Sequence, residues 1–98
     1  MALRNQIHQN AVAIIIDANP TLVAEVEKAS EAELCGMSRA EYLDVRVSRA
    51  LELQARLQRM HPWEYQLRLA ERSGIDVSGV REEDRRAEAA ALGIDSLL

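Results

Sequence analysis

The sequence predicts a mainly helical protein of one domain. Its 98 residues are close to the commonest size of a single domain. Gly (4) and Pro (2) are scarce, whereas Ala, Leu, Glu and Arg, which are strong helix formers, are plentiful. Aromatic residues make up 3% and there is no Phe, so the core must be aliphatic. A core of this size is only modestly stable, so we expect a homodimer that shares it.

The run at residues 11–16, Ala-Val-Ala-Ile-Ile-Ile, fits two structures. As a strand it has favourable β-branched residues, and Val12, Ile14 and Ile16 share one face. As a helix it belongs to a longer segment in which apolar residues recur at spacings of three and four. We predict a short strand followed by four helices, and we keep an all-α bundle as the alternative.

The four predicted helices are bounded by start and stop signals and cover residues 20–34, 38–60, 62–72 and 80–92. The clearest signal is Ser38 with Glu41 three residues later, which is typical of a capping box. Asn19 and Pro20 suit the N-cap and the first position of the first helix. Gly36 suits the position just beyond its end. These signals predict where the chain turns.

The helix predicted over residues 38–60 has an apolar stripe with one charged interruption. The stripe consists of Leu43, Val47, Ala50, Leu53, Leu57 and Met60, at spacings of three and four. Arg46 falls in the middle of it. Either the stem of Arg46 lies over the edge of the core with its guanidinium in water, or Arg46 is a paired charge at an interface.

The charge of the chain is uneven. The net charge is −4, with five acidic residues and one Lys in residues 17–35 and five Arg and three acidic residues in residues 36–60. An acidic chain disfavours non-specific binding to nucleic acid, which depends on neutralising phosphates, but the basic middle keeps duplex DNA open as a partner. The longest apolar run is too short for a signal peptide or a membrane span. We expect a cytoplasmic protein that does not bind membranes.

No group of residues in the sequence points to catalysis. His8 and His61 are far apart, and neither is spaced like the base of a nucleophilic site. Cys35 is the single cysteine, so it has no disulfide partner, and with the two histidines it gives no metal-ligand spacing. The four glycines are isolated and form no phosphate-binding loop. We expect no catalytic residue, metal, cofactor or small-molecule substrate.

Aromatic residues gather at the start of the third predicted helix. Trp63 and Tyr65 lie beside Pro62 in an aromatic-poor chain, and such residues are suited to binding hot spots. Alternatively they cover one end of the core. We predict that Trp63, Tyr65, Leu67 and Arg46 contact a protein partner, with the first three in the C-terminal half of the chain.

The first half of the chain contains, in order, the run at 11–16, the helix predicted at 20–34 and the sequence Gly-Met-Ser-Arg-Ala-Glu-Tyr-Leu at 36–43. This order resembles the ribbon-helix-helix family of dimeric DNA-binding proteins. The resemblance covers residues 11–54, which makes 11–56 a ribbon-helix-helix core and 57–98 a helical extension like the toxin-binding tails of antitoxins in that family. It implies two chains whose paired strands enter the major groove.

The resemblance also implies which residues contact DNA. The backbone at Ser38 and Arg39 would hold a phosphate at a helix N-terminus. Asn10, Ala11 and Ala13 would face the bases from the strand. The function that follows is a small, non-enzymatic, dimeric regulator, either a transcriptional repressor or an antitoxin. The alternative is a helical protein-interaction module, such as an inhibitor or assembly adaptor, that does not bind nucleic acid.

Overall fold

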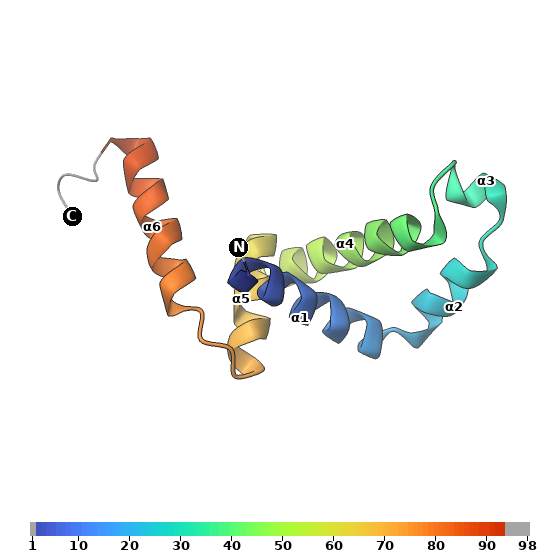
Figure 1. Ribbon diagram of the computed structural model, residues 1–98, viewed down its shortest axis with the longest axis horizontal. Helices are drawn as coiled ribbons and strands as arrows, with labels where there is room; N and C mark the ends of the chain where they lie inside the picture. The colour runs from blue at the N-terminus through green and yellow to red at the C-terminus, as the bar shows by residue number, and fades with distance from the viewer. Residues whose placement is uncertain (1, 94–98) are drawn as a thin grey trace.

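The computed structural model describes residues 2–93, in which it contains six helices and no strand. The helices are α1 (Ala2–Ala18), α2 (Pro20–Lys28), α3 (Glu31–Leu34), α4 (Arg39–Leu57), α5 (Pro62–Arg72) and α6 (Ser78–Leu92). The prediction of a mainly helical protein is confirmed. The molecule is elongated, because its radius of gyration of 16.5 Å exceeds the value of about 13 Å for a compact domain of this length. In Figure 1, α3 and α6 lie at opposite ends.

Residues 11–16 are helical, so the predicted strand is wrong. They belong to α1, which buries Ile7, Ala11 and Ile15 at intervals of four. This spacing aligns the three side chains on one face of a helix. Helix propensities differ by at most about 0.7 kcal/mol between ordinary residues, whereas burying one Ile contributes about 1.5–3 kcal/mol. Burial therefore outweighs the strand preference of the isoleucines, and the paired strands of a ribbon-helix-helix dimer are absent from residues 2–93.

The helix predicted over residues 20–34 is interrupted, because the backbone of Ala29 is extended. Ser30 then starts α3, since its hydroxyl oxygen accepts a hydrogen bond from the backbone N–H of Glu33 at 3.2 Å. This is a second capping signal that the sequence carried. Asn19 begins α2 without a side-chain cap, and its amide instead donates to the carbonyl of Ile15 at the end of α1 at 2.8 Å.

The start signals of α4 and α5 are confirmed. Ser38 and Glu41 form a complete capping box, in which the Ser38 hydroxyl accepts from the Glu41 N–H at 3.1 Å and the Ser38 N–H donates to the Glu41 carboxylate at 3.5 Å. α5 has the predicted bounds, and the His61 ring accepts from the N–H of Trp63. Gly36 has a φ of 82°, which a residue without a Cβ adopts without strain.

Two apolar clusters hold the helices together. The main cluster joins α1, α2, α4 and α5 and comprises Ala11, Ile15, Leu22, Val47, Leu51, Ala55, Tyr65 and Leu69. The minor cluster joins α1, α5 and the start of α6 and comprises Ile7, Leu67, Ala70, Val77 and Val80. α5 contributes one face to each cluster. The main cluster therefore crosses the predicted division between residues 11–56 and 57–98.

Candidate protein-interaction surface

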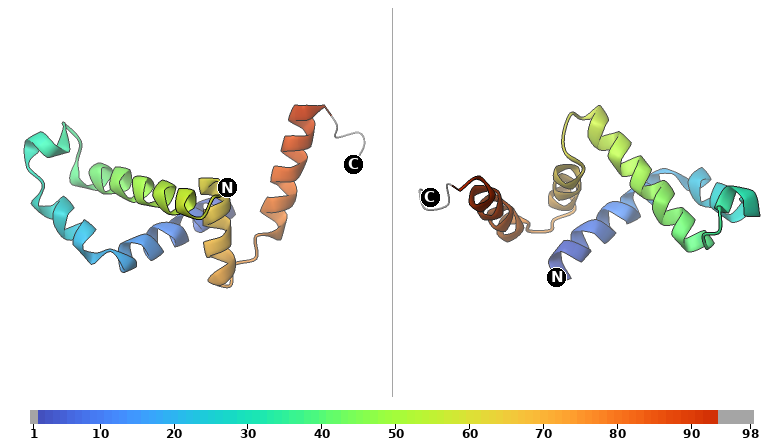
Figure 2. Two further views of the ribbon diagram at one scale, coloured as in Figure 1. Left: turned by 180° about the vertical axis from the view of Figure 1, so that it is seen from behind. Right: turned by 90° about the horizontal axis from the view of Figure 1, so that it is seen from above.

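The outer side of α4 leaves two leucines in solvent. The helix buries Val47, Leu51 and Ala55, whereas Leu53 and Leu57, one turn apart, are 53% and 68% exposed. No helix lies over α4 on the side opposite α1 (Figures 1 and 2). The predicted stripe is therefore wrong at Leu53 and Leu57. The helix carries two apolar stripes, and the one through Leu51 and Ala55 is the one that packs.

Two arginines border these leucines. Arg49 lies one turn before Leu53, and Arg56 lies beside Leu57. Both are exposed, and neither forms an ion pair with another residue of the described range 2–93. We call Arg49, Leu53, Arg56 and Leu57 the α4 face. It is an apolar strip beside free positive charge.

Arg46, which was predicted to contact a partner, is paired within the chain. Its guanidinium donates to the Glu25 carboxylate of α2 at 2.5 Å and lies 5.8 Å from the centre of the Tyr42 ring. The hydrogen bond to Glu25, and then the one to Tyr42, raises the pKa of Arg46. Arg46 thus ties α2 to the N-terminal half of α4.

The aromatic cluster lies mostly inside the fold. Tyr65 is 7% exposed in the main cluster and Leu67 is 2% exposed in the minor cluster. Trp63 is half-buried, and its indole N–H donates to Asp84 of α6 at 2.8 Å. The guanidinium of Arg4 lies over the same ring, 5.7 Å from its centre. This arrangement matches the alternative interpretation, in which these side chains cover one end of the core.

Arg4 and Trp63 together form a polar anchor for α6. Arg4 pairs with Asp84 at 2.8 Å and with Glu83 at 3.1 Å. The hydrogen bond from Trp63 lowers the pKa of Asp84, and the one from Arg4 lowers it further. The same contacts with Asp84 and Glu83 raise the pKa of Arg4. Arg4 and Asp84 therefore keep their opposite charges at neutral pH and hold one another.

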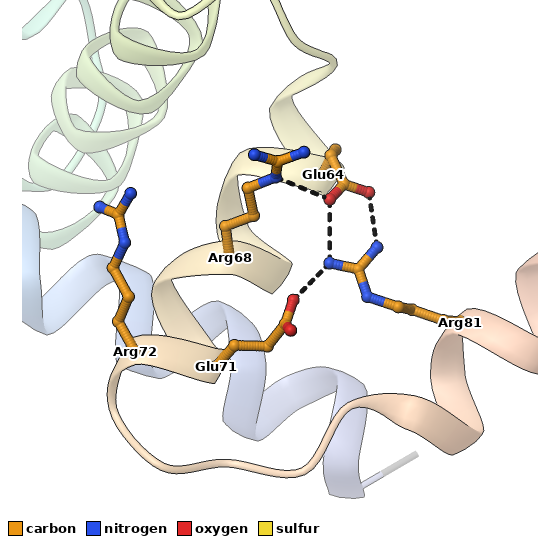
Figure 3. Close-up of a pocket in the computed structure, with 5 residues that line it drawn as sticks. All are labelled: Glu64, Arg68, Glu71, Arg72 and Arg81. Atoms are coloured by element: carbon orange, nitrogen blue, oxygen red, sulfur yellow. Dashed lines mark hydrogen bonds and ion pairs between the residues drawn. The ribbon is translucent and has the colours of Figure 1, made fainter.

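A second polar anchor joins α6 to α5, as Figure 3 shows. Arg81 donates to both carboxylate oxygens of Glu64, at 2.8 and 2.9 Å, and also to Glu71. Arg68 donates to Glu64 from the same helix at 3.2 Å. The hydrogen bonds from Arg81, and then from Arg68, lower the pKa of Glu64. Because the Glu64 carboxylate has a lowered pKa and is ionised, and because Glu64 and Glu71 are both already bonded to Arg81, the hollow that they line with Arg72 is poorly suited to proton transfer.

The residues predicted to contact DNA lie on two helices. Ser38 is engaged by Glu41 at the start of α4. Arg39 donates to the carbonyls of Val26 and Ala29, both at 2.9 Å, and so caps the end of α2. The others are on α1, where Ala11 is buried, Ala13 is exposed, and the amide nitrogen of Asn10 is buried with no acceptor in residues 2–93. Ala11 therefore presents no surface to a ligand.

Within residues 2–93, no three His, Cys, Asp or Glu side chains are grouped so as to hold a metal ion. No helix in that range has both the length and the apolar character needed to cross a bilayer. Cys35 is exposed in the turn before Gly36.

The exposure of the α4 face could have been predicted from the sequence, because α4 carries two apolar stripes and the prediction considered only one of them. Leu51 and Ala55 give α4 a second apolar stripe, roughly half a turn around the helix from Leu53 and Leu57. A helix at the edge of a bundle can bury only one such stripe. A second stripe flanked by Arg49 and Arg56 is thus a sign of an exposed apolar surface.

The amino-acid sequence matches a family model over nearly its whole length. The matched residues are 1–96, and the model describes a "Family of unknown function (DUF6388)". The match spans all six helices and both apolar clusters. Comparisons with curated proteins and with solved structures found no match. The chain belongs to the family of unknown function DUF6388.

Proposed function

We propose that this protein is a small, non-enzymatic, helical protein-interaction module, and that the α4 face binds an apolar and acidic segment of a partner protein. The observation that carries this proposal is the exposure of Leu53 and Leu57, one turn apart, beside Arg49 and Arg56. Apolar anchors at a spacing of four on one helix are typical of helix-mediated recognition. The arginines add a preference for negative charge.

Burying the two leucines supplies the affinity. A fully exposed Leu gains about 1.5–3 kcal/mol on burial. Leu53 and Leu57 are partly covered already, so together they contribute about 2–3 kcal/mol, or roughly 100-fold in affinity. Arg49 and Arg56 at the rim speed association and select the partner.

The charge of the α4 face favours an acidic partner over a second α4 face. In a two-fold symmetric pair the same surface meets itself, which brings Arg49 and Arg56 near the arginines of the other copy. Like charges at an interface are unfavourable. Phosphates of DNA would suit the arginines but not the leucines beside them. The homodimer expected from the small size of the chain therefore needs a different surface.

The test uses photo-crosslinking in cells, followed by binding with purified components. A photoreactive residue at Leu53 should give a discrete adduct, whereas one at Ser48, which is exposed on the same helix away from this face, should not. The partner, once identified and purified, should bind Leu57→Glu roughly 100-fold more weakly and should lose affinity with rising salt. Equal adducts from both positions, or unchanged binding by Leu57→Glu, would contradict the proposal.

Duplex DNA binding by a repressor or antitoxin is the rival function, and it follows from the ribbon-helix-helix resemblance. It predicts duplex binding at about 50 mM salt, with a log–log salt slope set by several phosphate contacts. Fluorescence anisotropy with a labelled duplex measures both quantities. Duplex binding that is lost in Arg39→Glu but retained in Leu53→Glu would favour the regulator over the α4 face as the functional surface.

A further inference from the structure

We infer that α6 is an exchangeable arm, which docks on the α1–α5 surface of its own chain or on the same surface of a second copy. Residues 73–77, between α5 and α6, join this arm to helices α1–α5, which we call the body. This inference rests on the minor cluster and the two polar anchors, and it does not depend on the α4 face.

The attachment of α6 comes from its first two turns. The anchoring side chains there are Val80, Arg81, Glu83 and Asp84. In the second half of the helix, Arg85 and Arg86 bond to Glu82 of α6 itself. Ala89 is buried in that half, but Leu92 is 68% exposed. In Figures 1 and 2 this half stands apart from α1 and α4.

Open hollows border α6 on several sides of these anchors. One of about 450 Å³ is lined by Trp63, Leu67 and Asp84 among others. A second of about 190 Å³ lies where Leu3 faces Val80, and a third of about 440 Å³ surrounds the Arg81 anchor (Figure 3). α6 is therefore held by a few separate contacts and not by a continuous core, which favours local opening.

The surface beneath α6 is complementary to α6. Ile7, Leu67 and Ala70 are almost fully buried in the minor cluster, which α6 completes with Val80. If the arm opens, these apolar side chains lose part of their cover. An α6 helix from a second copy restores it with the same groups. Arg81 is presented to Glu64 and Glu71, and Asp84, three residues on and on the same face, is presented to Trp63 and Arg4.

The connection between α5 and α6 is long enough for exchange. It contains five residues, 73–77, which can span about 17 Å when extended. It turns at Gly74, which has a φ of 86°. Opening such a turn converts contacts within one chain into the same contacts between two chains, which makes exchange a low-cost route to a dimer. It also gives the expected homodimer a surface that avoids the arginines of the α4 face.

Complementary charge variants test the exchange. In Arg81→Glu, α6 is repelled by the body of its own chain, and in Glu64→Arg/Glu71→Arg the body repels its own Arg81. When the two variants are mixed, each α6 matches the body of the other chain. We expect native mass spectrometry to show a 1:1 heterodimer at least tenfold more abundant than either homodimer. A chain with all three substitutions is the control, and it should return to wild-type behaviour.

The outcome that overturns exchange is equally specific. If the mixture forms no heterodimer while the triple variant regains the wild-type fluorescence of Trp63, α6 docks only within its own chain. A second variant covers the case in which the charge variants do not fold. Deleting Ser73 and Gly74 keeps every anchor but makes the connection too short to turn back, so the chain should become a stable dimer by light scattering. A helical chain that stays monomeric after this deletion also overturns the inference.

Discussion

The main cluster and the α6 junction are held by different forces. The main cluster packs apolar side chains from four helices, and among residues 2–93 no charged or polar residue is buried. The α6 junction has a smaller apolar cluster with two partly exposed polar anchors at Arg4 and Arg81. Apolar burial contributes about 25 cal/mol per Å², whereas a surface ion pair contributes about 0–1 kcal/mol. We expect the main cluster to set the global stability and the α6 junction to open first.

The largest effect should come from breaking the main cluster. Leu51→Ala removes a fully packed side chain from α4 and should lower the free energy of unfolding by about 2–5 kcal/mol. Leu53→Ala is the matched control, because the same side chain two residues along is 53% exposed. It should cost less than about 0.5 kcal/mol. Urea unfolding followed by circular dichroism at 222 nm measures both values, and similar losses for the two variants would place Leu53 in a core.

A smaller effect, confined to one region, should come from breaking the α6 junction. Asp84→Ala removes the acceptor of the Trp63 indole and the partner of Arg4. We expect a loss of about 1 kcal/mol, since these groups are partly exposed. Hydrogen exchange should speed up along α6 while the amides of α4 near Leu51 keep their protection. Equal acceleration in both helices would mean that the two regions unfold together.

The same contrast explains what could be predicted from the sequence. Helix ends depend on local chemistry, so the capping box of Ser38 and Glu41 and the bounds of α5 were predicted correctly. The strand at residues 11–16 was wrong because local preference favoured it, whereas the burial of Ile7, Ala11 and Ile15 against distant helices decides the structure. Tertiary packing overrides propensity there.

Candidate site residues were harder to predict, because their roles depend on contacts between distant residues. Trp63 meets Asp84 21 residues later, and Arg4 meets Asp84 80 residues later. No spacing rule in the sequence connects such pairs. Arg39 was placed correctly at a helix N-terminus. Its guanidinium donates to carbonyls at the end of α2, and no pattern in the sequence predicts this contact. Which of two stripes on α4 is exposed likewise depends on where α1 and α5 pack.

Arg39 offers a smaller test, in which a polar anchor acts inside the region held by the main cluster. Arg39→Met removes two hydrogen bonds to the last carbonyls of α2 and keeps most of the side-chain stem. The expected loss is about 1 kcal/mol or less, because the residue is exposed. Arg49→Met is the control on the same helix, since Arg49 has no ion pair in residues 2–93. Hydrogen exchange should speed up in α2 and α3 for the first variant and nowhere for the second.

The smallest effect should come from acid, which titrates the anchors of α6 without touching the main cluster. The pKa of Glu64 is lowered chiefly by Arg81, and that of Asp84 chiefly by Trp63 and then Arg4. The pKa of Asp76 is lowered by the backbone N–H and hydroxyl of Ser78 at the start of α6. Carboxyl groups with a lowered folded-state pKa stabilise the folded state above their unfolded pKa, which is about 4, and lose that contribution as pH falls through the folded value.

Below about pH 4, α6 should therefore loosen before the body unfolds. Trp63 is the single tryptophan, and its indole N–H donates to Asp84 of α6. Its fluorescence therefore reports on the contact between α5 and α6. We expect its emission to change at a higher pH than the ellipticity at 222 nm. In Asp84→Asn, which keeps an acceptor for the indole but cannot ionise, the early change should shrink. If the two signals instead change at the same pH in the wild-type chain, the α6 junction and the main cluster unfold as one cooperative unit. The difference between polar anchors and apolar packing would then not separate the two regions during unfolding.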